Sequence, residues 1–426
     1  GQSALGANTT GTSNVAVGRG ALDANTTADN NTAVGDNALG ANTTGSENTA
    51  VGSSALDANT TGLYNTAMGY NALTTEVDGD YSTAIGFTAL EAQVSDSTGQ
   101  NVYNVAVGAL AGSNLTTGVE NTFVGSGAGG NGVTTSDKNV GLGAWALYAL
   151  TSGTYCTAVG ANSLDANTTG TANTALGTFS LGANISGQHN TALGYEALTV
   201  NLANYNTAVG YQALTANSTG ADNTAIGYRA GKLITTGFNN VLLGEDAGDT
   251  LTEGSKNVCL GLNVSTSAVD SEYQIVIGYD MNGGEDNQVT IGKASNVIQC
   301  EFDTDATWTR TSDVAMKQDI EDDTLGLEFI NDLRTVTFRW KPSNEFPKEW
   351  NDYSEENLMT TDTTMHGMVA QDVKSALDKA GVDTFGGWGE RSDGSQVLGR
   401  DMFVMPLIKA VQELSAEIEK LKKEQN

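Results

Sequence analysis

The sequence predicts a mainly β protein: a parallel β-solenoid of 17-residue coils, followed by a small α+β domain that ends in a short coiled-coil helix. Two observations predict this fold. The segment Asn48–Gly62 reads Asn-Thr-Ala-Val-Gly, then Ala-Leu, then Ala-Asn-Thr-Thr-Gly, and copies of it recur throughout residues 1–292. A fixed short period indicates a repeat architecture. The composition then changes sharply near residue 311: glycine becomes less frequent, and all three prolines lie beyond this point.

Landmark glycines such as Gly35, Gly52 and Gly69 set the period of the repeat. The 17-residue spacing holds in almost every case, but it widens between Gly86 and Gly108 and narrows before Gly292. Such a repeat is too short for two helices, and Gly, Thr and Asn dominate where helix formers would be expected. The Ala-Val and Ala-Leu clusters each fit a short strand, with Gly and Asn-Thr-Thr-Gly as turns. Each copy is therefore expected to form one coil, stacked ~4.8 Å from the next.

The two apolar slots of the Ala-Val strand point to opposite faces. The Val slot is apolar in every copy, as at Val51, Met68 and Ile85, and the Ala slot is nearly always small. A strand that is apolar on both faces is buried on both. Because a 17-residue coil has room for only one thin core, the second face is expected to contact another copy of the chain. We therefore expect an oligomeric rod, most simply a trimer.

Charge and composition exclude several classes of partner. The formal net charge of −30 divides into −20 for residues 1–311 and −10 for the rest, which argues against nucleic acid and anionic membranes as partners. No apolar run approaches the ~20 residues that span a bilayer, so no membrane insertion is expected. The three cysteines match no metal-ligand spacing, and we expect neither a metal nor a cofactor. Gly1 falls in mid-repeat, so the chain is expected to continue a longer one.

Some features interrupt the repeat. An insertion centred on Glu91–Gln100 is expected to bulge outward, where insertions in solenoids often carry recognition. Trp145, Tyr148 and Tyr155 could stack on a sugar ring or simply pack. The Asn-Thr-Thr copies match the glycosylation sequon but are expected to be turns. Acidic clusters such as Asp78-Gly79-Asp80 are expected to be solvated turns rather than calcium sites.

The Asn-Thr-Ala-Val-Gly-x-x-Ala-Leu repeat of residues 1–292 resembles the head repeat of trimeric autotransporter adhesins. That repeat is a left-handed parallel β-roll in which three chains pack along a shared axis, and related repeats are common in phage tail fibres. The resemblance implies a homotrimer that binds a host-surface receptor, with a glycan as one candidate. After the repeat, residues 293–311 alternate apolar and polar residues around Val297, Ile298 and Phe302, and we expect a neck where three chains wind together.

Several motifs follow in order in residues 312–426. Together they resemble the intramolecular chaperone domain found at the C-termini of phage endosialidases and tail fibres. They are Ser312-Asp313 with Lys317, Leu325–Ile330 with Leu333-Arg334, Val336–Lys341, His366–Val373 and Leu407–Leu414.

This resemblance implies trimerisation, assistance to folding of the upstream fibre, and then self-cleavage between Thr311 and Ser312. Ser312 would be the nucleophile, Lys317 its base, and His366 would either help to position the site or be structural. The enzyme would be a single-turnover serine peptidase with a Ser-Lys dyad that acts on its own chain only. A lysine can serve as base when burial or a nearby cation lowers its pKa.

The sequence departs from the family pattern next to the lysine. The family commonly carries a basic residue and Leu there, whereas Ala315 and Met316 precede Lys317 here, and slower cleavage is therefore expected. A spacing of five also places Ser312 and Lys317 roughly 140° apart on a helix and on opposite faces of a strand. Either the segment turns between them, or Lys317 of one chain serves Ser312 of another. As an alternative, Ser312-Asp313 could cap a helix and Lys317 could be a surface charge.

The C-terminal tail predicts a helix over residues 402–424. Its apolar residues are spaced alternately by four and three, which is the seam of a coiled coil. Two heptads are too short to be stable alone, so the helix is expected to pack as a trimer against its own domain. The seam consists of Leu407, Val411, Leu414, Ile418 and Leu421.

The function expected from these features is that of a homotrimeric phage tail fibre, a structural and receptor-binding protein. It would fold in the host cytoplasm and act in the virion, outside the cell after release. The C-terminal domain would drive trimerisation and then be removed by cleavage. The alternatives are a bacterial trimeric surface adhesin and a Thr-rich ice-binding solenoid. No motif for chemistry on another molecule stands out.

Overall fold

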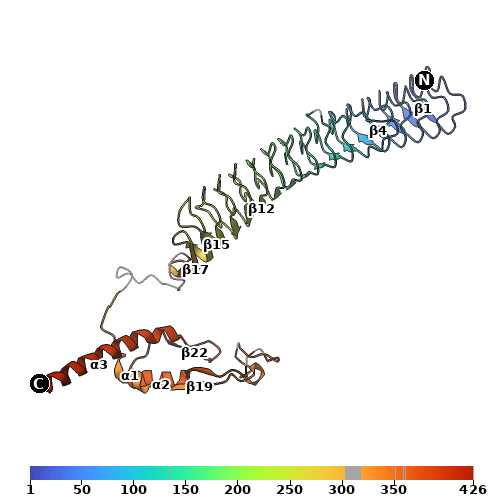
Figure 1. Ribbon diagram of the computed structural model, residues 1–426. Helices are drawn as coiled ribbons and strands as arrows, with labels where there is room; N and C mark the ends of the chain where they lie inside the picture. The colour runs from blue at the N-terminus through green and yellow to red at the C-terminus, as the bar shows by residue number, and fades with distance from the viewer. Residues whose placement is uncertain (133, 303–317, 351, 358, 360, 426) are drawn as a thin grey trace. The chain divides into compact units, whose positions relative to one another are not determined.

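In the computed structural model the chain forms two compact units, Gly1–Thr311 and Ser312–Asn426 (Figure 1). The structure describes residues 1–132, 134–302, 318–350, 352–357, 359 and 361–425. The first unit is a parallel β-solenoid of about 16 turns, and the second is a small α+β domain that ends in a helix. The predicted fold class is therefore confirmed for the single chain.

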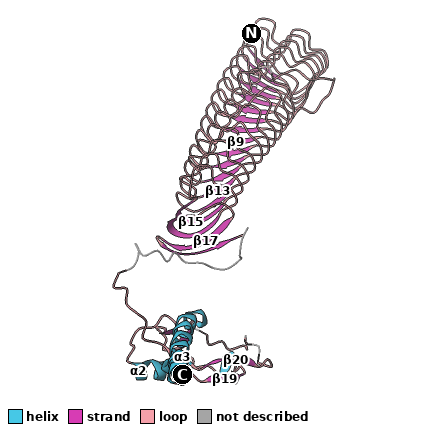
Figure 2. Cartoon of the chain, turned by 60° about the vertical axis from the view of Figure 1, so that its left-hand side comes forward, coloured by secondary structure: helices cyan, strands magenta, loops and turns pink. Residues whose placement is uncertain are grey.

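One short strand per turn builds most of the solenoid. Each strand pairs in parallel with the strand of the next turn, so that equivalent slots stack in register; Ala50, for example, is the partner of Ala67. Figure 2 shows these strands as one ladder along the unit. The three-residue strands are β1 (Val15–Val17), β2 (Thr32–Val34), β3 (Thr49–Val51), β4 (Thr66–Met68), β5 (Thr83–Ile85), β6 (Val105–Val107), β7 (Thr122–Val124), β8 (Val140–Leu142), β9 (Thr157–Val159), β10 (Thr174–Leu176), β11 (Thr191–Leu193), β12 (Thr207–Val209), β13 (Thr224–Ile226) and β14 (Val241–Leu243).

The strands lengthen at the C-terminal end of the solenoid. They are β15 (Val258–Ser265), β16 (Ile275–Asn282), β17 (Gln288–Lys293) and β18 (Asn296–Glu301). Strand β18 turns back and pairs antiparallel with β17, and Val297 packs against the solenoid core. Part of the segment predicted as a neck, residues 296–301, is therefore the last strand of the sheet. Residues 303–311 lie outside the described part of the chain.

The second strand predicted for each coil is wrong, because the Ala-Leu segment is a turn. The leucine adopts the left-handed conformation, as at Leu56 with φ 53°. This backbone costs about 1–2 kcal/mol. The Leu56 side chain is fully buried, however, and such burial contributes about 1.5–3 kcal/mol. Hydrogen bonds between turns also continue here, since the Leu56 N–H donates to the Ala72 carbonyl at 3.0 Å.

The landmark glycine is required by its backbone. Gly52 has φ 137°, a conformation that is accessible to glycine and strained for other residues. A Cβ atom there would lie 2.3 Å from the carbonyl oxygen of Gly69 in the next turn. The same close approach recurs along the ladder, for example at Gly227 against Gly244. Both the turn and the stacking distance therefore exclude a side chain at this slot.

The asparagine that precedes each strand belongs to a buried polar ladder. The Asn48 Nδ2 donates to the Gly62 carbonyl at 2.8 Å, and its Oδ1 accepts from the Asn65 backbone N–H at 2.9 Å. A second ladder uses the asparagine of Asn-Thr-Thr, where the Asn59 Nδ2 donates to the Asn42 Oδ1 at 3.0 Å. All these side chains are fully buried. The Asn-Thr-Thr copies are therefore structural turns, with amides that the folded chain keeps from solvent.

The two faces of the strand ladder differ in exposure. The Ala slots, such as Ala50 and Ala67, are fully buried in the solenoid core. The apolar residue directly before each landmark glycine points outward, and Met68, Leu176 and Leu193 each expose more than 40% of their surface. We call these outward apolar residues, one from each of the strands β1–β17, the outer rank. One chain alone leaves the outer rank partly exposed to solvent.

The insertion of residues 91–100 is anchored at both ends and exposed between them, and at its far end the Gln100 carbonyl accepts from the Asp80 N–H at 2.9 Å. The buried Gln93 donates to the Glu76 Oε2 at 3.0 Å and to the Ser82 Oγ at 2.9 Å. Residues 96–99 beyond it are exposed. The segment thus takes the outward bulge expected of it, fastened to the solenoid by a glutamine in an asparagine slot.

The C-terminal unit packs short elements around a small aromatic core. Phe329, Phe385 and Phe403 contact one another, with ring centroids 5.2–6.4 Å apart. The predicted helix of residues 402–424 is α3, which begins two residues later because a 3₁₀ turn precedes it. The elements are α1 (Leu327–Asp332), β19 (Thr335–Phe338), η2 (Ser343–Glu345), β20 (Met365–Met368), α2 (Ala370–Ala380), β21 (Trp388–Glu390), β22 (Gln396–Leu398), η3 (Arg400–Phe403) and α3 (Val404–Glu424).

Candidate functional site

The predicted cleavage site lies outside the described residues. Thr311, Ser312 and Lys317 all fall in residues 303–317, so the nucleophile and base remain predictions from the sequence. What the structure does place is the division of the chain. One unit comprises residues 1–311 and the other residues 312–426, so the division falls at the bond proposed for cleavage.

His366 lies on β20, which pairs antiparallel with β19 so that His366 is opposite Thr337. Its side chain is exposed. An exposed imidazole on a strand can reach a neighbouring segment, but its role toward Ser312 and Lys317 stays a prediction because neither of them is described.

The helix α3 has two different faces. Pro406 and Ala410 are buried against the domain. The five residues of the predicted seam point away from it and expose 42–60% of their surface: Leu407, Val411, Leu414, Ile418 and Leu421. The seam is therefore not used within one chain, although the same helix is anchored to its domain through another face.

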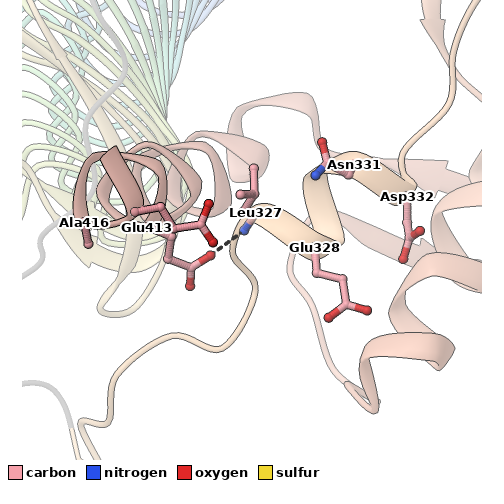
Figure 3. A pocket seen from close by; sticks show the side chains of 7 residues that line it. Leu327, Glu328, Asn331, Asp332, Glu413 and Ala416 are labelled. Atoms are coloured by element: carbon pink, nitrogen blue, oxygen red, sulfur yellow. Dashed lines mark hydrogen bonds between the residues drawn. The ribbon is translucent and has the colours of Figure 1, made fainter. Parts of the chain in front are cut away.

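An open acidic groove lies between α1 and α3 (Figure 3). The Glu413 carboxylate accepts a hydrogen bond from the Leu327 backbone N–H at 2.7 Å and so ties the start of α1 to α3. On the other side of α1, Lys379 donates to Asp332 at 2.7 Å, and this hydrogen bond raises the pKa of Lys379. These bonds fix α3 within its unit. The groove is lined by Leu327, Glu328, Asn331, Asp332, Glu413, Ala416 and Glu417.

Sequence reasoning missed two rows of exposed aromatic residues that flank the strand ladder of the solenoid. The leading row takes the residue just before the buried asparagine slot of each turn, and the trailing row takes the residue just after the landmark glycine. The signal was present in the sequence as a 17-residue spacing of aromatic residues. The aromatic members and one histidine are Tyr64, Tyr81, Tyr103, Tyr155, His189, Tyr205 and Tyr273 in the leading row, and Tyr70, Phe87, Tyr195, Tyr211, Tyr228 and Tyr279 in the trailing row.

The aromatic residues singled out from the sequence contact their own chain. Trp145 and Tyr148 pack edge to face with centroids 4.8 Å apart, and the Lys138 ammonium lies 5.6 Å from the Tyr155 ring. The cysteines are free thiols, and Cys156 and Cys259 are fully buried. Within the described residues, no three His, Cys, Asp or Glu side chains are grouped to hold a metal.

No helix in the described part of the chain is long and apolar enough to cross a membrane.

Comparison with known proteins finds a similarity for part of the C-terminal unit. Residues 312–382 match the family model described as chaperone of endosialidase. No curated protein matches the chain. The match begins at Ser312, the first residue of the second compact unit. The chain therefore joins a parallel β-solenoid to a C-terminal unit whose residues 312–382 are similar to the endosialidase chaperone family.

Proposed function

We propose that the chain is the shaft of a homotrimeric phage tail fibre, whose C-terminal domain gathers three chains, assists their folding and is then released. One observation carries this proposal. The match to the chaperone family begins at Ser312, and the compact units divide at the same Thr311–Ser312 bond. A domain that leaves after folding needs such a boundary, because its removal must not break the core of what remains.

The exposed apolar surfaces support a trimer. The outer rank of the solenoid and the seam of α3 each leave large apolar side chains in solvent in one chain. Contiguous exposed apolar surface commonly marks an interaction site. A two-heptad seam is too short to hold chains together alone. Anchored to a folded domain through Glu413 and Ala410, α3 can instead contribute its seam to an interface that already exists.

A chaperone domain would help the strands of this shaft to begin pairing in the correct register. Most turns contribute only a short strand, and the parallel pairing must start in the right register in every chain. Non-local pairing of this kind folds slowly. A C-terminal domain that trimerises first would hold three chains side by side at their C-terminal ends, so that their turns stack in step.

The proposed release is a self-cleavage at Ser312. Its hydroxyl oxygen attacks the Thr311 carbonyl carbon while Lys317, as the neutral amine, accepts the hydroxyl proton. The carbon–nitrogen bond breaks and the Ser312 nitrogen takes a proton, which leaves an ester. Water then hydrolyses the ester to a carboxylic acid and restores the hydroxyl. The whole reaction uses one water and no cofactor.

The proposal places the protein in the virion, folded in the host cytoplasm and exposed outside the cell after release. Its partner would be a receptor on the host surface, with a glycan as one candidate. A bacterial trimeric adhesin remains the alternative, since it would use the same repeat.

Native mass spectrometry together with denaturing mass spectrometry tests the proposal. Three associated chains are expected, with a C-terminal fragment of ~12 kDa when the 44.0 kDa of the chain is scaled to residues 312–426. Ser312→Ala and Lys317→Met should each leave the chain uncut. Ser375→Ala, which alters an exposed serine of α2, should cleave normally. A monomer by native mass would contradict the trimer, and a fragment from Ser312→Ala at the same bond would contradict the proposed nucleophile.

A further inference from the structure

We propose that the leading row of one chain packs against the trailing row of its neighbour at the same turn of the solenoid, so that the shaft interface is a ladder of aromatic contacts between chains. This inference rests on the homotrimer proposed above and specifies its contact residues. The strongest example pairs Tyr81 of one chain with Phe87 of the next.

The first observation is that aromatic residues occupy both rows in several turns, although Tyr103, Tyr155 and Tyr228 have no aromatic counterpart in their own turns. Six turns carry a tyrosine in the leading row and six carry an aromatic residue in the trailing row, and four turns carry both. His189 with Tyr195 adds a further turn of the same kind. The four doubly aromatic turns hold Tyr64 with Tyr70, Tyr81 with Phe87, Tyr205 with Tyr211, and Tyr273 with Tyr279.

Charged residues, in contrast, never occupy both rows of the same turn. No turn from residue 13 to residue 293 carries a charged residue in both rows. Glu47 shares its turn with Ser53, and Lys256 shares its turn with Leu262. Rows that meet across an interface must avoid like charges at one height, because such pairs are destabilising.

The second observation is that this match has no explanation within one chain. In the described part of the chain, the ring contacts of the two rows run along each row and not from one row to the other. Tyr64 stacks on Tyr81 with centroids 4.8 Å apart, and Tyr70 stacks on Phe87 at 5.6 Å. Residues of the two rows in the same turn lie beyond opposite ends of the strand, as Tyr64 and Tyr70 do around β4. Their pairing therefore needs a second chain.

The third observation is the backbone of the leading row. Tyr64, Tyr81 and Tyr103 have φ of 60°, 62° and 54°, the left-handed region that glycine and asparagine adopt most readily. A bulky residue there costs about 1–2 kcal/mol. The buried leucines of the Ala-Leu turn offset this cost by core burial, but Tyr81 still exposes 41% of its surface. The same slot is left-handed where it carries Glu47 or Lys138, so the coil imposes this backbone, and burial of the tyrosine rings against another chain would offset part of its cost.

The symmetry of a trimer determines which row of one chain contacts which row of its neighbour. Three parallel chains around one axis place equivalent residues at equal height, and the contact between neighbours joins two different surfaces of the chain. If the outer rank faces the axis, the rows on its two sides become those surfaces. The leading row of each chain then faces the trailing row of the next, around a closed ring.

The ring stacking favours a protein partner over a sugar. A sugar ring stacks on the face of an aromatic side chain, but the faces of Tyr211 are taken by Tyr195 and Tyr228, with centroids 5.5 and 5.3 Å away. What remains open are ring edges and hydroxyl groups. Edge-to-face packing by aromatic rings of a neighbouring chain suits that surface.

Site-directed crosslinking of the full chain tests the proposal. In a Cys300→Ser background, which removes the only partly exposed cysteine, Tyr81→Cys and Phe87→Cys are introduced together and treated with a short bis-maleimide. Each chain should link to two neighbours, and a covalent trimer should dominate on a denaturing gel. Each single variant should give no more crosslinking than the background. The pair Tyr81→Cys with Tyr211→Cys, whose members lie on distant turns, is the matched control and should not crosslink.

Native mass separates this inference from the proposed function. A native trimer with no crosslinking of the Tyr81–Phe87 pair, or with equal crosslinking of the distant pair, overturns the row contact and leaves the homotrimer standing. A native monomer overturns both. If the Tyr81–Phe87 variant fails to assemble, the pair Tyr205→Cys with Tyr211→Cys provides the same test at another turn.

Discussion

Replacing Asn223 by alanine removes one member of the buried ladder of the solenoid. The Asn223 Nδ2 donates to the Gly237 carbonyl at 2.8 Å. Its Oδ1 accepts from the backbone N–H and from the Nδ2 of Asn240, both at 3.0 Å. The side chain is fully buried, so water cannot take over these bonds. The substitution leaves two backbone groups without this partner, the Gly237 carbonyl and the Asn240 N–H.

The magnitude follows from those two groups. Each buried backbone group without a partner costs about 1–3 kcal/mol, so the free energy of unfolding should fall by about 2–6 kcal/mol. For a unit of roughly 300 residues, whose unfolding entropy near the midpoint is about 0.6 kcal/mol per degree, the Tm should fall by about 3–10 °C. Circular dichroism measures the Tm of the assembled chain, and hydrogen exchange reports the opening of the Asn240 amide.

Gln188→Ala is the control, because it removes an exposed amide side chain from the solenoid. Its Tm should change by less than about 1 °C, as surface substitutions usually alter stability by at most ~0.5 kcal/mol. If Asn223→Ala has the same Tm as Gln188→Ala, and the Asn240 amide exchanges as slowly as in the unchanged chain, the buried ladder does not stabilise the coil as argued.

Further predictions concern the ladder, the thiols and the landmark glycine. Cys156→Asn should raise the Tm by a few degrees, because the sulfur is a weak partner for the buried Gly170 carbonyl and an amide gains about 1 kcal/mol per bond. Burial, with a smaller effect of the Asp249 charge, raises the pKa of Cys259 to about 12. The folded state keeps a proton on Cys259 that the unfolded chain loses above pH ~9, so the contribution of this thiol to stability is constant below pH ~9 and falls as the pH rises toward 12. In alkaline melts Cys259→Ala should show a shallower slope, and the buried Cys156, whose pKa is also raised, contributes to the slope that remains. Gly227→Ala should abolish assembly by native mass, because its Cβ would lie 2.3 Å from the next turn's carbonyl oxygen, whereas Ala221→Gly should assemble.

Part of the candidate site could be predicted only through resemblance. Ser312 and Lys317 were identified because their motif matches a known family, not because their spacing defines a catalytic pair. Composition predicts a division of the chain near residue 311, since glycine-rich repeats and a proline-containing domain have different residue usage. The seam of α3 is likewise a prediction from the sequence, because a heptad repeats within a single helix and needs no tertiary information.

The elements that sequence reasoning missed depend on how turns stack. The Ala-Leu pair predicts an apolar strand. In the structure Leu56 instead lies in a turn with left-handed φ, and in that turn its N–H donates to the Ala72 carbonyl of the next coil. The buried asparagines read as ordinary turn residues, and only their complete burial shows that they bridge successive coils. Tyr64 and Tyr81 have no distinguishing feature in the sequence. Only the stacking of the turns places their ring centroids 4.8 Å apart.

The sequence by itself determined the period, the parallel solenoid and the apolar character of both strand faces. A regular repeat suffices for this, because in-register parallel pairing stacks each slot on its own copy. The tertiary structure decided which slots turn, which are buried, and that the outer rank and its flanking aromatic rows stay exposed in one chain. The reason is physical: backbone conformation and burial are set by the neighbouring turn, which is a full repeat away in sequence but in direct contact in space.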